Sequence, residues 1–394
     1  MTLNTHSWVR VGLALALAAP AVATAADPAV ATAYSMQRCD ERLQRGIDLI
    51  YNLEFAAADR YFQEVIAAEP QNPAGHFFLA MVTWWRVLAD LKDESHDQAF
   101  YDLLEQCIAV CDRRLEQDPR DFDAVICKGG AIGFRGRLRG DRDQYLHAAS
   151  DGLKSLPLLQ LSRELEPTNK DILFGQGIYN YFAEVMPREY PIVRPVVALL
   201  PSGDRLQGLQ QLQQVVDEGY YARAEAAYFL AQIYRVFEKD NRKALSYLEQ
   251  LHARYPGNAL FHRYTARTLI EVGRWQTGVS LYQEVVRLSQ GGRPGYHVYG
   301  QVEALYYIGK YAFYQGHQDE ALQAFTAADS LAAGLPEDRV EVYVPLSELM
   351  LGMIYDMEGY REQAVARYRQ VEDLPDLGNS HEMAAKFLKV PYRP

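Results

Sequence analysis

The sequence predicts an all-α solenoid of about eight helical hairpins in a right-handed superhelix, ended by a C-terminal capping helix. The stretch from Pro345 to Pro375 contains two helix-length apolar patterns separated by Gly359. Small residues at Gly352 and Ala364 would let these two helices touch, with tyrosine rings filling the remaining space. Imperfect copies recur in phase along most of the chain, as expected when stacked hairpins bury a continuous core.

This unit resembles the tetratricopeptide (TPR) repeat, a 34-residue helix–turn–helix that recurs in arrays. Phasing the chain on it gives six repeats over residues 39–290, a Gly/Pro break at residues 291–295, and two more repeats over residues 296–378. We expect the break to act as a hinge, because Gly and Pro both interrupt helices. Residues 379–394 read as a capping helix and tail, with Ser380 as the N-cap.

Three segments depart from the repeat pattern and are expected to be insertions. They are a polar loop at residues 90–98, an Arg/Gly-rich loop at residues 135–142 and a Pro-rich apolar segment at residues 186–203. The third segment is too short to span a bilayer. We expect it to pack on the repeats, or alternatively to touch a partner or a membrane, as exposed apolar patches do.

The N-terminus predicts a secretory signal peptide over residues 1–25, followed by a linker over residues 26–38. A short basic stretch precedes the apolar run Val11–Ala19, and Ala23-Thr24-Ala25 is a small-residue cleavage pattern. Removing residues 1–25 takes away Arg10 and no carboxylate, so the formal net charge changes from −11 to −12. A chain this acidic is a poor generic binder of nucleic acid or anionic membrane. The sequence therefore predicts a periplasmic or secreted protein without a transmembrane segment.

Four cysteines, Cys39, Cys107, Cys111 and Cys127, allow but do not require a disulfide. Export permits disulfides, and Cys107 or Cys111 could bridge to Cys127 on the next helix. The alternative is that all four are small buried apolar side chains.

A wider resemblance covers about a third of the chain, between Gly129 and Tyr264. Its motifs are GGAIGFRGRLRGD, FGQGIYNYFAEVMP, PSGDRLQGLQQL and AAYFLAQIY. They are similar to an exported bacterial TPR family of unassigned function. The middle two are also faintly similar to eukaryotic outer-mitochondrial-membrane TPR proteins linked to inclusion clearance. The resemblance supports the fold and implies no catalytic residue.

The resemblance to TPR arrays implies a ligand-binding inner wall formed by the first helix of each hairpin, at positions one turn apart. Mapping that wall gives an aromatic half that becomes basic toward the C-terminus: Phe77, Met81, Trp84, Phe174, Ile178, Tyr181, Tyr228, Arg235, Arg263, Arg267, Tyr306, Lys310 and Phe313. Such a wall suits a peptide with apolar anchors and an acidic or carboxylate end. The alternative is that the aromatic side chains pack on neighbouring helices and the arginines are solvated.

The Arg-rich segment offers a second candidate site. Its members are Arg135, Arg137, Arg139 and Arg142. Arginine binds phosphate and carboxylate bidentately, so these residues could bind envelope lipid or cell-wall polysaccharide together with the apolar insertion. Intramolecular pairing is the favoured interpretation, because Asp141 and Asp143 lie alongside.

Catalysis finds little support in the sequence. The histidines are scattered and form no HExxH or other metal-spaced pair. There is no GxSxG motif, P-loop or dinucleotide-binding GxGxxG motif. We therefore expect no enzyme, metal or cofactor, although a helical enzyme with convergent carboxylates stays an alternative. The leading hypothesis is an exported TPR scaffold that binds a protein or peptide, in an oligomeric state that the sequence does not indicate.

Overall fold

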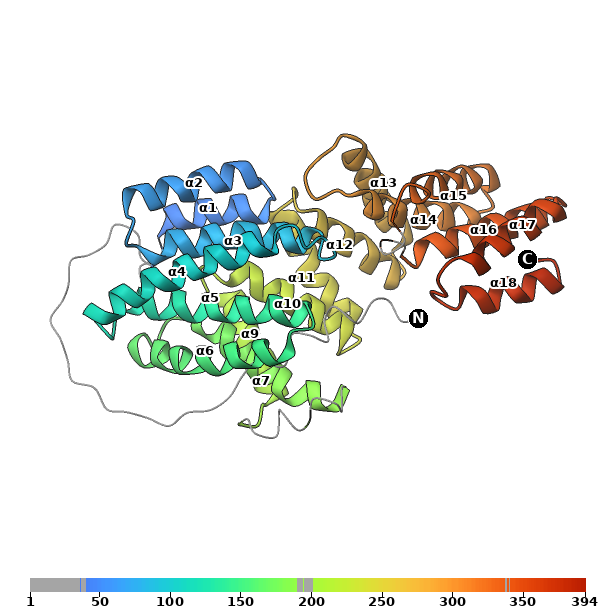
Figure 1. The fold of residues 1–394 in the computed structure, drawn as a ribbon. Coiled ribbons are helices and arrows are strands. Elements are labelled where there is room, and N and C mark those ends of the chain that lie inside the picture. Colours follow the sequence, from blue (N-terminus) through green and yellow to red (C-terminus); the bar gives the residue numbers. More distant parts are fainter. Residues whose placement is uncertain (1–35, 37–39, 190–193, 195–200, 337–338, 340) are drawn as a thin grey trace. The chain divides into compact units, whose positions relative to one another are not determined.

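The computed structural model describes residues 36, 40–189, 194, 201–336, 339 and 341–394. The described residues form helices joined by turns and loops, and contain no strand. The chain divides between Gly257 and Asn258 into two compact units (Figure 1), here called the N-terminal unit and the C-terminal unit. The predicted signal peptide lies outside the described residues, as do most of the linker, Cys39 and the apolar part of the third insertion.

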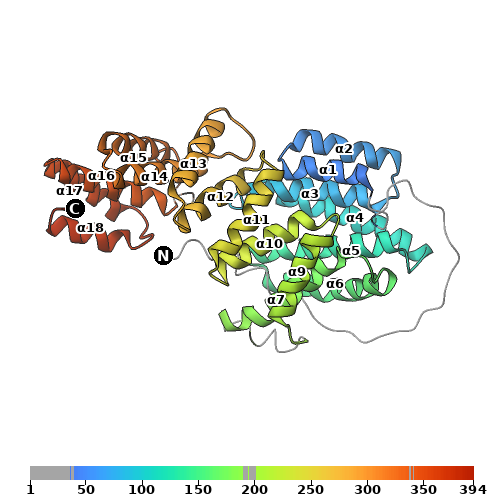
Figure 2. The ribbon, with the colours of Figure 1, turned by 180° about the vertical axis from the view of Figure 1, so that it is seen from behind.

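The N-terminal unit contains five helical hairpins. Figure 1 shows α3 to α6 on the near side of this unit, and Figure 2, from behind, shows α9 to α11. The hairpins are α1 (Glu41–Tyr51) with α2 (Phe55–Ala68), α3 (Pro73–Ala89) with α4 (Asp97–Gln117), α5 (Phe122–Asp141) with α6 (Tyr145–Leu165), α7 (Ile172–Glu189) with α9 (Arg205–Glu218), and α10 (Arg223–Val236) with α11 (Asn241–Arg254).

The C-terminal unit contains three hairpins and a final helix. They are α12 (Ala259–Glu271) with α13 (Trp275–Gln290), α14 (Val298–Tyr314) with α15 (Gln318–Ala332), α16 (Tyr343–Met357) with α17 (Arg361–Asp373), and α18 (Ser380–Lys389). Helix α18 packs on α17, where Phe387 lies 5.6 Å from the ring of Tyr368, and Arg361 donates to the carbonyl oxygens of Phe387 and Leu388. The eight predicted hairpins and the capping helix are confirmed.

Small residues bring the two helices of a hairpin together, as the repeat pattern predicts. A Cβ atom at Gly352 would collide with the ring of Tyr368 in the partner helix. A Cβ atom at Gly309 would stand 2.9 Å from the ring of Phe325. Because packed interiors have no room for an extra methyl group at such distances, glycine fixes the close approach of these helices.

Polar side chains start many of the helices. Asp204, predicted to begin α9, accepts a hydrogen bond from the backbone N–H of Gln207 at 2.8 Å. The predicted N-cap Ser380 is wrong, because Ser380 is the first residue of α18 and Asn379 precedes it with φ of 61°. Asp376 instead accepts from the backbone N–H of His381 at 3.2 Å.

The N-terminal unit closes on itself, because its first helix contacts its last hairpin. The hydroxyl of Tyr51 in α1 donates to Glu225 in α10 at 3.1 Å. The backbone N–H of Gly257, after α11, donates to Asn52 at 3.2 Å. These contacts join residues about two hundred positions apart, so the inner faces of the first five hairpins surround a common space.

The predicted insertions are each partly helical. The prediction of an Arg/Gly-rich loop is wrong over residues 135–141, because these residues continue α5. Leu138 and the arginine side chains pack between neighbouring helices, which favours the helix over a loop. The predicted third insertion begins later than expected, since α7 extends to Glu189 and Met186 is fully buried. In the first predicted insertion, residues 90–96 form the loop between α3 and α4, and residues 97–98 begin α4.

The disulfide that the sequence allowed between Cys127 and Cys107 or Cys111 is not formed among the described cysteines. Cys107, Cys111 and Cys127 are free and buried, which is the alternative that the sequence left open. Burial raises the pKa of the Cys127 thiol. Within the described ranges, no helix is both long enough and apolar enough to cross a bilayer.

Candidate functional site

A half-open cavity of about 270 Å³ lies at the centre of the N-terminal unit. Its wall comes from α1, α3, α5, α7 and α10, which are the first helices of the five hairpins, and from α6, the second helix of the third hairpin. These are the inner helices on which the sequence placed a binding wall. The closure of α1 against α10 turns that wall into a cavity.

The lining of the cavity is mainly apolar and rich in aromatic side chains. Its aromatic members are Tyr51, Phe77, Phe78, Trp85, Phe134, Phe174, Tyr221 and Phe229. Ligand sites in proteins commonly combine such a lining with a few polar groups that orient the ligand. The charged groups in this lining are Arg137, Asp171 and Glu225.

The α5 side of the cavity is made largely of glycine. Gly129, Gly130, Gly133 and Gly136 all line it. Glycine in a helix interior costs about 1 kcal/mol relative to alanine, so each one requires a reason. Gly130 has one in packing, because a Cβ atom there would stand 2.9 Å from the ring of Phe77.

Gly133 has no such reason in the packing of the protein. Among the described residues, a Cβ atom at this position would meet no atom within 4 Å, and the residue is exposed. Alanine at Gly133 would thus fit among these residues and favour the helix. The backbone of α5 is instead left bare at the cavity surface.

Arg137 and Glu225 form the polar corner of the cavity. The Arg137 guanidinium lies between two aromatic rings, with Cζ 4.7 Å from the Trp84 ring and 4.5 Å from the Phe229 ring. Its Nη1 atom is 3.8 Å from Oε1 of Glu225, and Tyr51 donates to Oε2 at 3.1 Å. Burial raises the pKa of Glu225, and Arg137 and Tyr51 partly offset that shift. Cation–π contacts and the ion pair together hold the two charged side chains in place.

Asp171 has a structural role at the edge of the cavity. Its carboxylate accepts from the backbone N–H groups of Tyr220, Tyr221 and Ala222 at 2.8, 3.1 and 3.0 Å, which fixes the start of α10. Negative charge at a helix N-terminus is also favourable for the helix dipole.

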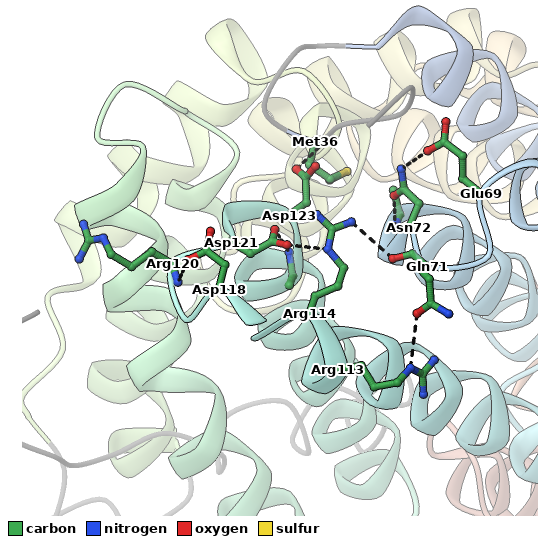
Figure 3. Close-up of polar contacts among 12 residues, drawn as sticks. Met36, Glu69, Gln71, Asn72, Arg113, Arg114, Asp118, Arg120, Asp121 and Asp123 are labelled. Carbon is green, nitrogen blue, oxygen red and sulfur yellow. Dashed lines mark hydrogen bonds and ion pairs between the residues drawn. The ribbon is translucent and has the colours of Figure 1, made fainter. Parts of the chain in front are cut away.

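Polar contacts also fix the loops at another edge of the N-terminal unit (Figure 3). Arg114 of α4 forms an ion pair with Asp121 at 2.5 Å and donates to the carbonyl oxygen of Gln71 at 3.4 Å, which connects the α2–α3 and α4–α5 loops. Asp123 accepts from the backbone N–H of Met36 at 2.9 Å (Figure 3). Met36 also lines the cavity.

Four of the predicted wall residues meet in the cavity. Phe77, Met81, Phe174 and Ile178 all line it. Other members of the predicted wall are core residues: Trp84, Tyr181 and Tyr228 are fully or almost fully buried. Tyr181 donates to Glu238 at 2.7 Å, away from the cavity lining. Arg235 is half-buried and donates to Gln232 at 3.0 Å.

The Arg-rich segment is neutralised inside the protein. Asp151, fully buried in α6, accepts from Arg135 at 2.5 and 3.0 Å and from Arg139 at 2.5 Å. Arg142 forms an ion pair with Asp97. Together with the Arg137–Glu225 pair, these contacts agree with the favoured interpretation of intramolecular pairing. Only Arg137 belongs to the cavity.

The predicted basic residues of the C-terminal unit meet a buried carboxylate. Glu303 of α14 is fully buried; its Oε2 accepts from Arg263 at 2.5 and 3.0 Å, and its Oε1 from Arg267 at 2.7 Å and from Tyr282 at 2.6 Å. Burial alone would raise the pKa of Glu303, but Arg267, Arg263 and Tyr282 lower it to about 2. Arg263 and Arg267, which the sequence placed on the ligand-binding wall or alternatively in solvent, are instead nearly buried and share one counter-charge.

The remaining predicted wall residues also lie in the C-terminal unit. Tyr306 is buried, and Lys310 is half-buried with Nζ 3.2 Å from the Tyr306 hydroxyl. Burial lowers the pKa of Lys310. Phe313 is half-buried and packs 6.3 Å from the ring of Tyr392.

Sequence reasoning missed much of the cavity lining, including Tyr51, Glu225 and Gly133. Tyr51 and Glu225 come from helices that meet only through closure of the unit, and Gly133 was assigned beside a loop. A signal was present for Glu225, which is a single acidic residue in the apolar run AEAAYFLAQIY. A lone carboxylate in a buried helix requires a partner.

No protein-family model and no curated protein matches the sequence. Among solved structures, the chain is similar to a human IFIT1 dimer with PPP-AAAA, at 13% identity and a TM-score of 0.43, over 82% of this chain and 69% of that chain. It is also similar to the C-terminal part of a TPR repeat-containing protein from Cytophaga hutchinsonii, at 16% identity and a TM-score of 0.37, over 76% and 99%. A third similar structure is the P58(IPK) TPR domain, at 15% identity and a TM-score of 0.27, over 89% and 88%.

These likenesses are too distant to carry a conclusion about ligands or partners. The architecture rests on the hairpins themselves: two helices per repeat, small residues at the helix contact, and a terminal helix that covers the last hairpin. The described part of this chain is an all-α solenoid of the TPR type.

Proposed function

We propose that this chain is a non-catalytic, exported TPR scaffold that binds a protein or peptide partner through an apolar anchor in the cavity of the N-terminal unit. The observation that carries the proposal is the convergence of the inner helices of five hairpins on that one cavity. TPR-type arrays present their inner helices to ligands, and this unit has an apolar cavity there.

The chemistry of the lining favours an anchor that is itself apolar. Fully burying one large apolar side chain contributes about 1.5–3 kcal/mol, and interface energy concentrates in such pocket-filling side chains. The basic end expected for the groove does not support the proposal, because Glu303 neutralises much of the Arg263 and Arg267 charge. The partner feature that we propose is thus the apolar anchor alone.

The alternative, binding of envelope lipid or polysaccharide through the Arg-rich segment, has no observation that favours it. All four of its arginines are ion-paired within the protein. Their carboxylate partners occupy the positions that an external anion would require.

The test is affinity purification of the tagged full-length protein after crosslinking in its native envelope. Gly133→Leu fills the cavity from the α5 side, where no atom lies within 4 Å of the new Cβ. Gly334→Leu is the matched control, because Gly334 is exposed and its nearest neighbour would be at 3.7 Å. We expect a partner that wild type and the control retain and Gly133→Leu loses. Identical partner sets for all three proteins would contradict the proposal.

Export is tested separately by intact mass spectrometry of the protein from its natural source. The proposal predicts a mature chain that begins after Ala25, in an extracytoplasmic fraction. A full-length chain in the cytoplasmic fraction would overturn that part.

A further inference from the structure

We infer that the cavity is shaped for a tryptophan-sized aromatic side chain of the partner, inserted with its ring against the bare α5 backbone at Gly133 and its N–H group toward Glu225. This inference rests on the proposed function, because it names the anchor that the scaffold would hold. Three observations lead to it: the volume of the cavity, the charges in its wall and the empty space at one glycine.

The volume sets the size of the anchor. An engineered cavity of about 150 Å³ in another protein holds benzene, with about six non-hydrogen atoms. In proportion, the 270 Å³ found here accommodates about eleven non-hydrogen atoms. A tryptophan side chain has about ten, whereas leucine has about four and would leave most of the space unfilled. The size therefore favours the largest aromatic side chain.

The wall charges argue against a fatty acyl chain of similar volume. Glu225 and Asp171 bring two carboxylates to the lining against the single guanidinium of Arg137. An acyl carboxylate would approach this wall against like charge, which is unfavourable in a partly buried site. A neutral anchor avoids that repulsion.

The Glu225 carboxylate favours an anchor with a hydrogen-bond donor. Its Oε2 accepts from Tyr51, and the Trp84 and Trp85 side chains also help to lower the pKa of the carboxyl group. Its Oε1 lies 3.8 Å from Nη1 of Arg137 and, within the described part of the chain, accepts no hydrogen bond of good geometry. Glu225 is only 5% exposed, and a buried acceptor gains from a donor that reaches it. Indole supplies one N–H donor on an otherwise apolar ring, and aromatic rings of this kind bind well among the aromatic side chains of the lining.

Gly133 supplies the flat surface. No atom of the described residues would lie within 4 Å of a Cβ at Gly133, so packing against those residues does not demand glycine there. An aromatic ring of the partner placed against the helix backbone does demand glycine at position 133, since any side chain there would occupy the space of the ring. Gly133 is therefore the residue that determines which partner side chains fit into the cavity.

The test uses N-acetyl-5-fluorotryptophanamide as the probe, titrated with the full chain and followed by ¹⁹F NMR. We expect weak saturable binding, with a Kd on the order of a millimolar. Gly133→Leu should weaken it at least about tenfold, and Gly334→Leu should leave it unchanged. Circular dichroism checks that both variants fold.

Competition against the same probe on wild-type protein tests the chemistry without any substitution. N-acetyl-tryptophanamide should displace it, whereas N-acetyl-leucinamide and the N1-methylated tryptophan amide should each require about tenfold higher concentration, because one is too small and the other lacks the donor. Displacement by decanoate at lower concentration than the tryptophan amide would overturn the inference in favour of an acyl chain. Equal competition by the methylated amide, or absence of probe binding, would also overturn it.

These outcomes separate the inference from the proposed function. A partner that Gly133→Leu loses, in a protein that does not bind the probe, would leave the scaffold proposal standing and refute the indole anchor. Probe binding, without any protein partner whose capture depends on Gly133, would refute the scaffold proposal and leave the indole-binding cavity standing.

Discussion

Replacing Glu303 with glutamine is expected to destabilise the C-terminal unit by about 3–5 kcal/mol, because it leaves two buried arginines without a counter-charge. Glu303 is fully buried and accepts from Arg263, Arg267 and Tyr282. Its pKa is lowered from 4.5 to about 2. At about 1.4 kcal/mol per unit, that difference corresponds to roughly 3 kcal/mol of stabilisation of the charged form. The two arguments give the same order of magnitude.

The sign of the pH dependence follows from the same shift. Because the folded state lowers the pKa of Glu303, its contribution is fully present above about pH 4.5 and is lost as the pH falls through about 2. Glu303→Gln should remove that part of the acid destabilisation. The variant and the wild type should then differ most near neutral pH and converge in acid.

Urea denaturation followed by hydrogen exchange with mass spectrometry measures the effect, because peptides from α12 to α14 report on the C-terminal unit alone. Glu284→Gln is the control, since Glu284 forms only an exposed ion pair with Arg287, and we expect no measurable loss there. A loss below about 1 kcal/mol for Glu303→Gln would refute the reasoning. Replacing the three charged residues Glu303, Arg263 and Arg267 together by apolar residues should restore most of the stability.

Three further predictions follow from buried groups and glycines. Burial raises the pKa of Glu348 to about 8, so the stability that it contributes is complete below about pH 4.5 and is lost as the pH rises through about 8; Glu348→Gln should flatten the dependence of the melting temperature on pH between about 4.5 and 8. Gly352→Ala should cost about 1–3 kcal/mol in urea denaturation, because the new methyl group collides with Tyr368. Gly133→Ala should instead stabilise the protein by about 0.5–1 kcal/mol, and a loss there would show that packing demands the glycine.

The hairpins were predictable because their determinants are local. A glycine in one helix and an aromatic ring about sixteen positions later recur as Gly46–Phe62, Gly309–Phe325 and Gly352–Tyr368, and in each pair the two residues meet in the structure. Such contacts require no knowledge of the rest of the chain. The same holds for Asp204, whose side chain binds the N–H group of a residue three positions away.

The Arg-rich segment was assigned as a loop for a physical reason that composition cannot resolve. Glycine and arginine are both common in exposed loops, and the partners of these arginines are not in the segment. Asp151 and Glu105 reach Arg135 from α6 and α4 once those helices pack on α5. Long-range packing makes the segment helical and buried.

The cavity was only half predictable. Helical periodicity placed Phe77, Met81 and Phe174 on the inner wall, as the structure does. Periodicity alone does not show that α1 returns to α10, so it could not bring Tyr51 to Glu225. For the same reason Trp84 and Tyr181 were assigned to the wall, although both are core residues.

Site-specific photocrosslinking tests most directly whether the cavity holds the partner. p-Benzoylphenylalanine would replace Phe77, whose side chain lines the cavity, and in a control would replace Leu146, which is 82% exposed on α6 and does not line it. In cells of the natural source, we expect a discrete crosslinked partner from position 77 and none from position 146. The same products from both positions, or no product from position 77, would contradict the account.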